Sequence, residues 1–159
     1  MATYTDSFGF DKGTAALPVN NGLHRVSLVQ VELDFAAITA ARVAAGATAL
    51  TSGDVIEAMP IPAKSYVLAL GLDVTTAEGG TLTIDVGDGD DADGFLDGVN
   101  ANTVASYANA LSLAEATPNT VVGYSNGKYY AAADTIDVTT VNAADTAVMR
   151  LWALVADCS

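Results

Sequence analysis

Short apolar runs separated by turn residues are the feature that most constrains the fold of this chain. The runs are rich in β-branched residues, and Gly, Asn and Asp stand between them. From Val26 to Phe35, apolar residues alternate with polar ones, which predicts a strand with one buried face. About eight runs of this kind predict an all-β protein, an antiparallel β-sandwich.

The other predicted strands follow from the same pattern and from the turns between them. They cover residues 55–59, 66–74, 81–86, 121–124, 128–130, 136–138 and 148–156. Pro60 and Pro62 belong at a strand end or a sheet edge. Glu78-Gly79-Gly80 predicts a hairpin between 66–74 and 81–86, and Ser125-Asn126-Gly127 predicts another before Lys128. Residues 148–156 are apolar on both faces apart from Arg150, which indicates a central strand buried on both sides.

One short helix interrupts the strand pattern. Residues 35–50 are rich in Ala, which favours a helix from Phe35 to about Val43. Gly46 is expected to end it. The segment from Val104 to Ala116 shows no clear periodicity, and the pattern assigns it to neither helix nor strand.

The chain divides into an arm and one domain. Its 159 residues match the usual size of a single domain. Residues 1–23 show neither helical nor strand periodicity, so we expect an N-terminal arm followed by one sandwich domain over 24–159. Tyr4, Phe8 and Phe10 make the arm more aromatic than a solvated tail requires, and the arm is expected to dock on a neighbour.

The charge of the chain excludes one class of partner. Six basic residues against 19 acidic ones give a net charge of −13. The phosphates of a nucleic acid would repel such a surface, so we expect no nucleic-acid binding. No apolar stretch reaches the roughly 18–20 residues of a spanning helix, so we expect no membrane insertion. The N-terminus resembles no secretory signal, which predicts synthesis in a cytoplasm.

A cluster of aspartates is the candidate cation site. Asp88, Asp90, Asp91 and Asp93 lie within the loop 87–94, and carboxylates are the ligands that calcium prefers. The spacing does not fit an EF-hand, because Val99 stands where a bidentate glutamate is required. A solvated acidic turn is the favoured interpretation, and calcium binding remains the alternative.

The motifs that resemble catalytic ones lack the required context. Gly123-Tyr124-Ser125-Asn126-Gly127 fits the G-x-S-x-G pattern of hydrolases, but a predicted strand follows it where a helix is needed. His24 is the only histidine, and it precedes the serine. Acidic residues are numerous, yet 15 of the 19 are Asp, which is common in turns. We therefore predict no enzyme, no catalytic or metal site and no cofactor.

Several runs of the sequence resemble the head-decoration, or cement, proteins of tailed bacteriophages. The likeness extends over about residues 26–158 and is carried by residues 53–63, 71–81, 93–99, 127–130 and 151–155. The resemblance implies a jelly-roll sandwich that assembles as a homotrimer on the outside of the virion head, where it binds the major capsid protein at capsomer junctions. Another virion component, such as a tail or host-recognition sandwich, is one alternative. A calcium-dependent binding module is the other.

Overall fold

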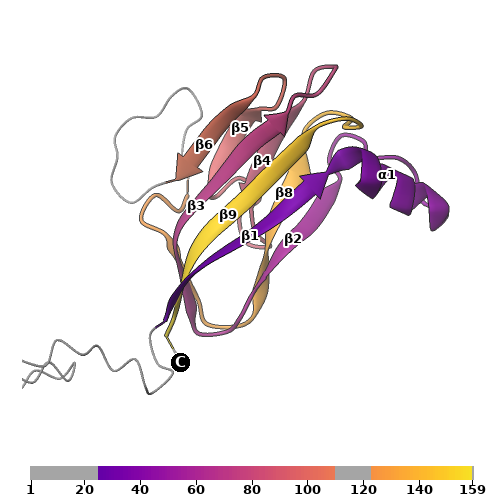
Figure 1. The fold of residues 1–159 in the computed structure, drawn as a ribbon. Helices are drawn as coiled ribbons and strands as arrows, with labels where there is room; N and C mark the ends of the chain where they lie inside the picture. Colours follow the sequence, from indigo (N-terminus) through magenta and orange to yellow (C-terminus); the bar gives the residue numbers. More distant parts are fainter. Residues whose placement is uncertain (1–24, 110–122, 159) are drawn as a thin grey trace, which may run out of the picture.

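The predicted antiparallel sandwich with one short helix is confirmed (Figure 1). The structure is a computed structural model, and it describes residues 25–109 and 123–158. The predicted arm, residues 1–23, lies outside the described residues. The single helix among the described residues has 10 residues, and none there is long and apolar enough to cross a membrane.

Two antiparallel sheets face each other. In the first sheet, β1 (Val26–Asp34), β9 (Val148–Asp157), β3 (Ser65–Thr76) and β6 (Ala105–Asn109) lie in that order, and β7 (Lys128–Tyr130) also pairs with β3. In the second sheet the order is β2 (Val55–Ile61), β8 (Asp134–Thr140), β4 (Thr83–Gly87) and β5 (Leu96–Asn100). With β7 set aside, eight strands form two four-stranded sheets and most connections cross between them, which is the pattern of a jelly roll.

The core lies between the two sheets and is built mainly from Leu, Val and Ile. Met149, Leu151 and Ala153 of β9 face Ile84, Val86, Ile136 and Val138 of the second sheet across this core, and all are buried. Within residues 25–109 and 123–158, only Phe35, Phe95 and Tyr130 contribute buried aromatic rings. The alternation seen in the sequence therefore places one face of each strand in the core.

The helix α1 (Phe35–Ala44) forms where alanine content predicted it (Figure 1). The Asp34 carboxylate caps its first turn by accepting a hydrogen bond of 3.0 Å from the Ala37 N–H, a standard N-cap. Gly46 follows the helix with φ +84°, a conformation that favours glycine. Phe35 is buried, so the helix is held mainly at its first residue.

The predicted hairpin between β3 and β4 is wrong, because these strands belong to different sheets. β3 already pairs with β9 on one side and with β6 and β7 on the other. The chain after β3 therefore crosses to the second sheet. Glu78 fixes this crossing: its carboxylate accepts hydrogen bonds from the backbone N–H groups of Asp145, Thr146 and Ala147.

The predicted hairpin around residues 125–127 is present only in part. The turn exists, with the Gly127 N–H donating to the Tyr124 carbonyl at 2.8 Å, and β7 follows it. Tyr124 is not in a strand, since its N–H donates to the Gly94 carbonyl. Residues 121–122 lie outside the described residues.

β9 is central in its sheet, as predicted, but only its inner face is fully buried. Trp152 and Leu154 alternate with the buried residues and are half-buried. No layer of described residues covers this outer face of the first sheet, so the prediction of burial on both sides is wrong for the described part of the chain.

Candidate functional site

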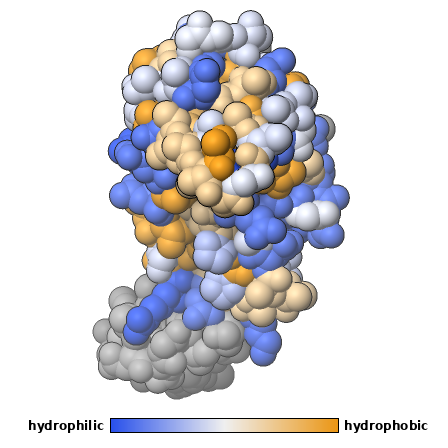
Figure 2. Space-filling view, turned by 90° about the vertical axis from the view of Figure 1, so that its right-hand side faces the viewer, coloured by the Kyte–Doolittle hydropathy of each residue, from blue (hydrophilic) through white to orange (hydrophobic). Residues whose placement is uncertain are grey.

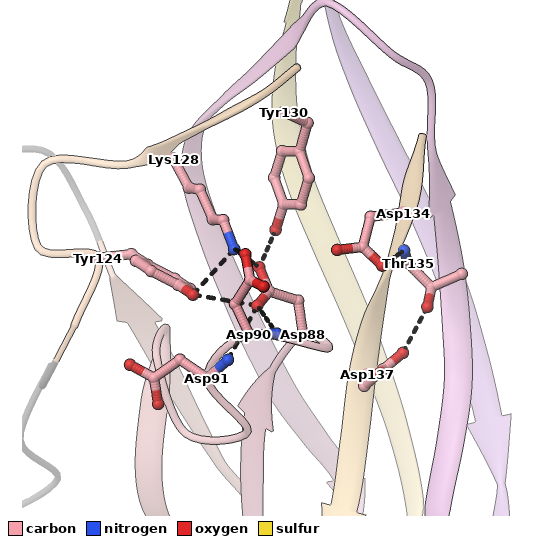
Figure 3. Close-up of polar contacts among 9 residues, drawn as sticks. All are labelled: Asp88, Asp90, Asp91, Tyr124, Lys128, Tyr130, Asp134, Thr135 and Asp137. Atoms are coloured by element: carbon pink, nitrogen blue, oxygen red, sulfur yellow. Dashed lines mark hydrogen bonds and ion pairs between the residues drawn. The ribbon is translucent and has the colours of Figure 1, made fainter. Parts of the chain in front are cut away.

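The acidic loop that joins β4 to β5 is organised by one buried carboxylate (Figure 3). The side chain of Asp88 is fully buried, although it belongs to the cluster predicted to be solvated. One oxygen accepts hydrogen bonds from the backbone N–H groups of Asp90 and Asp91, at 3.0 and 3.2 Å. The loop thus folds around the Asp88 side chain, as aspartates do in turns.

Three side chains from the segment 124–130 complete the shell of Asp88. The Lys128 ammonium lies 2.6 Å from the Asp88 Oδ2 atom, and the Tyr130 hydroxyl donates to the same oxygen at 2.6 Å. The Tyr124 hydroxyl donates to Oδ1 at 3.0 Å. Figure 3 shows the side chains of Tyr124, Lys128 and Tyr130 converging on Asp88. Five donors therefore surround one carboxylate.

This shell determines the protonation states. Burial opposes ionisation of Asp88, but the hydrogen bonds from Lys128 and Tyr130 outweigh it and hold its pKa below the usual range. Burial alone would lower the pKa of Lys128, yet its bonds to Asp88, Tyr124 and Asp90 raise it. Burial, reinforced by the Asp88 carboxylate, raises the pKa of Tyr130. At neutral pH the centre holds a carboxylate, an ammonium and neutral phenols, and it is suited to clamping the loop.

Close backbone packing surrounds the cluster and explains two glycines. A Cβ atom at Gly87 would overlap the backbone of Asp91 and Ala92, and one at Gly94 would overlap the Tyr124 ring. The Tyr124 ring also meets Phe95 edge-on, with ring centroids 4.9 Å apart. The Lys128 ammonium stands 4.6 Å from the centroid of Tyr124, within cation–π range. The clamp is therefore packed as well as charged.

The four predicted aspartates do not converge on a common point. Asp88 points inward, whereas the side chain of Asp90 is 79% exposed and pairs with Lys128 at 2.9 Å. A hydrogen bond with Asp93 raises the pKa of Asp91, so these two acids interact with each other. Within residues 25–109 and 123–158, no group of three or more His, Cys, Asp or Glu side chains has the geometry of a metal site.

Ser125 of the G-x-S-x-G pattern occupies a turn between Tyr124 and β7, so the required strand–turn–helix context is missing. His24 lies outside the described residues. Lys128, Tyr124 and Tyr130 were missed as partners of the acidic loop, because they lie 36 to 42 residues away from Asp88. The available signal was that Lys128 is the first basic residue after Lys64.

The outer faces of the two sheets differ in chemistry. On the first sheet, Val26 and Leu28 of β1 are 58% and 63% exposed, and they pair with Ala156 and Leu154 of β9. On the second sheet, the exposed Glu57 of β2 stands opposite Asp137 of β8, and burial raises the pKa of that aspartate. The outer face of the first sheet therefore carries an apolar patch at Val26 and Leu28, while farther along the same face Arg150 stands opposite Glu32 and pairs with Asp73. The outer face of the second sheet carries the acidic pair Glu57 and Asp137 beside the exposed Val55.

The helix end adds a further apolar area. Figure 2 looks onto this end, where apolar side chains gather. Val43 is 54% exposed, and no Asp or Glu occurs between Phe35 and Gly53. This end therefore exposes apolar side chains with no acidic residue between Phe35 and Gly53.

Comparison with known proteins gives structural likeness only. No family model and no curated protein sequence match the chain. Among solved structures, it is similar to a chain of the acidic stable capsid structure of Helicobacter pylori bacteriophage KHP30, with 16% identity, 86% of this chain and 92% of that chain covered, and a TM-score of 0.49. A chain of the cyanophage Pam1 capsid asymmetric unit shows 17% identity over 84% of each chain, with a TM-score of 0.45. A chain of the Ralstonia phage GP4 capsid shows 16% identity over 85% of this chain and 86% of that one, with a TM-score of 0.47. These values are too low to assign the chain to a family.

Proposed function

We propose that this protein is a structural component of a tailed-bacteriophage virion that decorates the outer surface of the capsid at capsomer junctions and stabilises the shell. The single observation that carries the proposal is the contrast between the two outer faces. An exposed apolar patch at Val26 and Leu28, on a chain of net charge −13, suits burial against a partner, and the acidic pair on the other outer face suits exposure to solvent on a crowded particle.

The sequence resemblance supports the same function. The runs that carry it coincide with β2, most of β5, β7 and parts of β3 and β9. These strands belong to both sheets, so the resemblance concerns the sandwich itself. We divide the chain accordingly into an arm, residues 1–23, and one sandwich domain, residues 24–159.

Stabilisation follows from selective binding. A protein that binds the assembled shell but not its separate subunits lowers the free energy of the assembled state. A symmetric shell repeats each contact many times, so a modest interface suffices when copies are joined into a homotrimer. The proposed partners are therefore the major capsid protein and further copies of this chain. This role requires no catalysis and no cofactor, and the clamped Asp88 centre supplies rigidity.

The test of this function is the copy number in purified virions, measured by quantitative mass spectrometry against the major capsid protein. We expect hundreds of copies in near-stoichiometric ratio. A handful of copies per virion would indicate a component of the tail or portal region instead. Complete absence from virions would overturn the virion assignment.

A binding experiment locates the contact face. Purified protein is sedimented with expanded shells that lack it, and the Leu28→Asp variant is compared with Glu57→Gln. Both positions are exposed, so both variants are expected to fold. We expect Leu28→Asp to weaken shell binding at least tenfold and Glu57→Gln to leave it unchanged. Equal binding by both variants would contradict the assignment of the apolar patch at Val26 and Leu28 as the contact.

A further inference from the structure

A cavity opens where the two sheets part at their β1 and β2 edges. It has a volume of about 340 Å³, near the lower end for pockets that hold a small ligand. Its walls are mainly apolar, with Val29 of β1, Val155 of β9 and the segment Pro60–Ala63. Arg25 and Asp157 also line it. A pocket of this size and character accommodates an aromatic side chain.

The charge around this cavity is opposite to that of the rest of the protein. Arg42, Lys128 and Arg150 each form an ion pair with an aspartate. The other two basic residues in the described part of the chain, Arg25 and Lys64, form no ion pair with a described residue. Arg25 lines the cavity, and Lys64 directly follows Ala63, which also lines it. With Asp157 counted against Arg25 and Lys64, these three residues at the cavity carry a net charge of +1, opposite in sign to that of the whole chain, which favours an acidic ligand.

The edge strand beside the cavity has an unused side. Among the described strands, β1 pairs with β9 alone, so its other side presents backbone groups that an added strand can pair with. The neighbouring edge strand β2 carries Pro60, which blunts it. β1 contains no proline and no lysine, and its two charged residues, Glu32 and Asp34, lie beyond Val29, the last β1 residue that lines the cavity. The part of β1 beside the cavity therefore lacks the residues that usually protect such an edge.

The N-terminal arm contains a segment with the matching chemistry. Its sequence from Asp6 to Asp11 is Asp-Ser-Phe-Gly-Phe-Asp, so two aromatic residues stand between two acids. In an extended strand Phe8 and Phe10 project to the same side, because side chains alternate with a period of two. Aromatic rings suit the apolar walls, and the aspartates suit Arg25 and Lys64.

We propose that the segment Asp6–Asp11 of a second copy of this chain binds along the free edge of β1 and inserts an aromatic side chain into the cavity. Exchange of arms then joins copies into the oligomer. The inference deepens the proposed self-association and rests on it for the choice of a second copy. Both copies are negatively charged overall, but the acidic segment Asp6–Asp11 of one copy attracts Arg25 and Lys64 of the other.

The first test is the mass of the isolated full-length protein in solution, measured by light scattering during gel filtration. The wild type is expected at a multiple of the 16.1 kDa chain mass. Two variants are expected at the mass of one chain: the arm variant Phe8→Ser/Phe10→Ser and the rim variant Arg25→Glu/Lys64→Glu. A wild type of single-chain mass, or variants that keep the wild-type mass, would overturn the proposal. Retained far-ultraviolet circular dichroism shows that each variant is folded.

Mixing distinguishes exchange between copies from insertion into the same chain. The arm variant keeps an intact cavity and the rim variant keeps an intact arm, so exchange predicts that a mixture of the two forms complexes that neither forms alone. The second measurement places a photoreactive benzoylphenylalanine at position 8 of the otherwise native chain. We expect a cross-link at twice the chain mass that maps to residues 25–29 or 60–65. A cross-link at single-chain mass, or none, would overturn the proposal.

These measurements use the isolated protein without capsid shells. Arm exchange can therefore be refuted while the proposed decoration function stands, and the reverse is also possible. A protein that coats shells but stays at single-chain mass would contradict arm exchange alone. An oligomer joined by its arms that binds no shell would contradict the decoration function alone.

Discussion

Replacing Lys128 by Met tests whether the Asp88 centre is a buried ion pair. The variant removes the ammonium but keeps an unbranched apolar stem of similar length, which preserves packing beside Tyr124 and Tyr130. The Asp88 carboxylate would then remain in the protein interior without its counter-charge. Its two tyrosine and two backbone donors remain, so the loss is confined to the charge partner.

The magnitude follows from the burial of the pair. The side chains of Lys128 and Asp88 are 14% and 0% exposed, and their charged atoms lie 2.6 Å apart. Removal of one partner from a buried pair costs about 3–5 kcal/mol, against ~0–1 kcal/mol for an exposed pair. We therefore expect the free energy of unfolding of Lys128→Met to fall by about 3–5 kcal/mol, a large share of the usual stability of a domain.

The assay is urea unfolding at neutral pH, with Asp90→Asn as the matched control. Asp90 binds the same ammonium at 2.9 Å, but its side chain is 79% exposed, so its loss should cost no more than about 1 kcal/mol. The double variant Asp88→Asn/Lys128→Met should recover part of the loss, because no buried charge remains unpaired. A cost below about 1 kcal/mol for Lys128→Met would refute the argument, since the pair would then behave as an exposed one.

Three further predictions concern the loops. Burial opposes ionisation of Glu78, but hydrogen bonds from Thr146 and its neighbours outweigh it and lower the pKa of Glu78 from 4.5 to about 2. The ionised Glu78 carboxylate therefore contributes to the free energy of unfolding above pH 4.5, and this contribution is lost as the pH falls towards 2. Glu78→Gln should reduce this acid sensitivity in pH-dependent unfolding, and unchanged sensitivity would contradict the assignment. Gly87→Ala should lower the free energy of unfolding by about 1–3 kcal/mol or more. Gly80→Ala is the control and should have little effect, because no atom lies within 4 Å of its added Cβ. Equal losses of unfolding free energy in the two variants would refute the packing argument. The melting temperature should be the same with calcium and with chelator, and an increase with calcium would restore the cation-site hypothesis for the loop 87–94.

The elements that could be predicted are those whose signals are local. Alternation in residues 26–34 depends only on which face is buried, and β1 formed as expected. The alanine content and Gly46 likewise predicted α1. The hairpin between β3 and β4 was wrong because Glu78-Gly79-Gly80 signals only a change of chain direction. A turn sequence does not reveal whether the next strand joins the same sheet or the opposite one.

The Asp88 centre could not be predicted, because its partners meet only after the sheets have formed. Lys128 and Asp88 are 40 residues apart, and β7 reaches the acidic loop by pairing with β3. Composition suggested that clustered aspartates face solvent or bind a cation. Burial reversed this expectation for one of the four, since a single internal ammonium is sufficient to neutralise Asp88.

The abundance of aspartate has a structural cause that bears on function. Asp34 caps α1, Asp54 accepts a hydrogen bond from the Thr51 N–H, and Asp85 accepts one from the Gly98 N–H. Asp88 does the same for two N–H groups of its own loop. A sandwich with many short connections needs such acceptors, and aspartate supplies them better than glutamate because its side chain is shorter. Part of the negative charge therefore follows from the fold. The exposed apolar residues Val26 and Leu28 on the outer face of the first sheet, which the turns do not require, are the more informative guide to the binding partner.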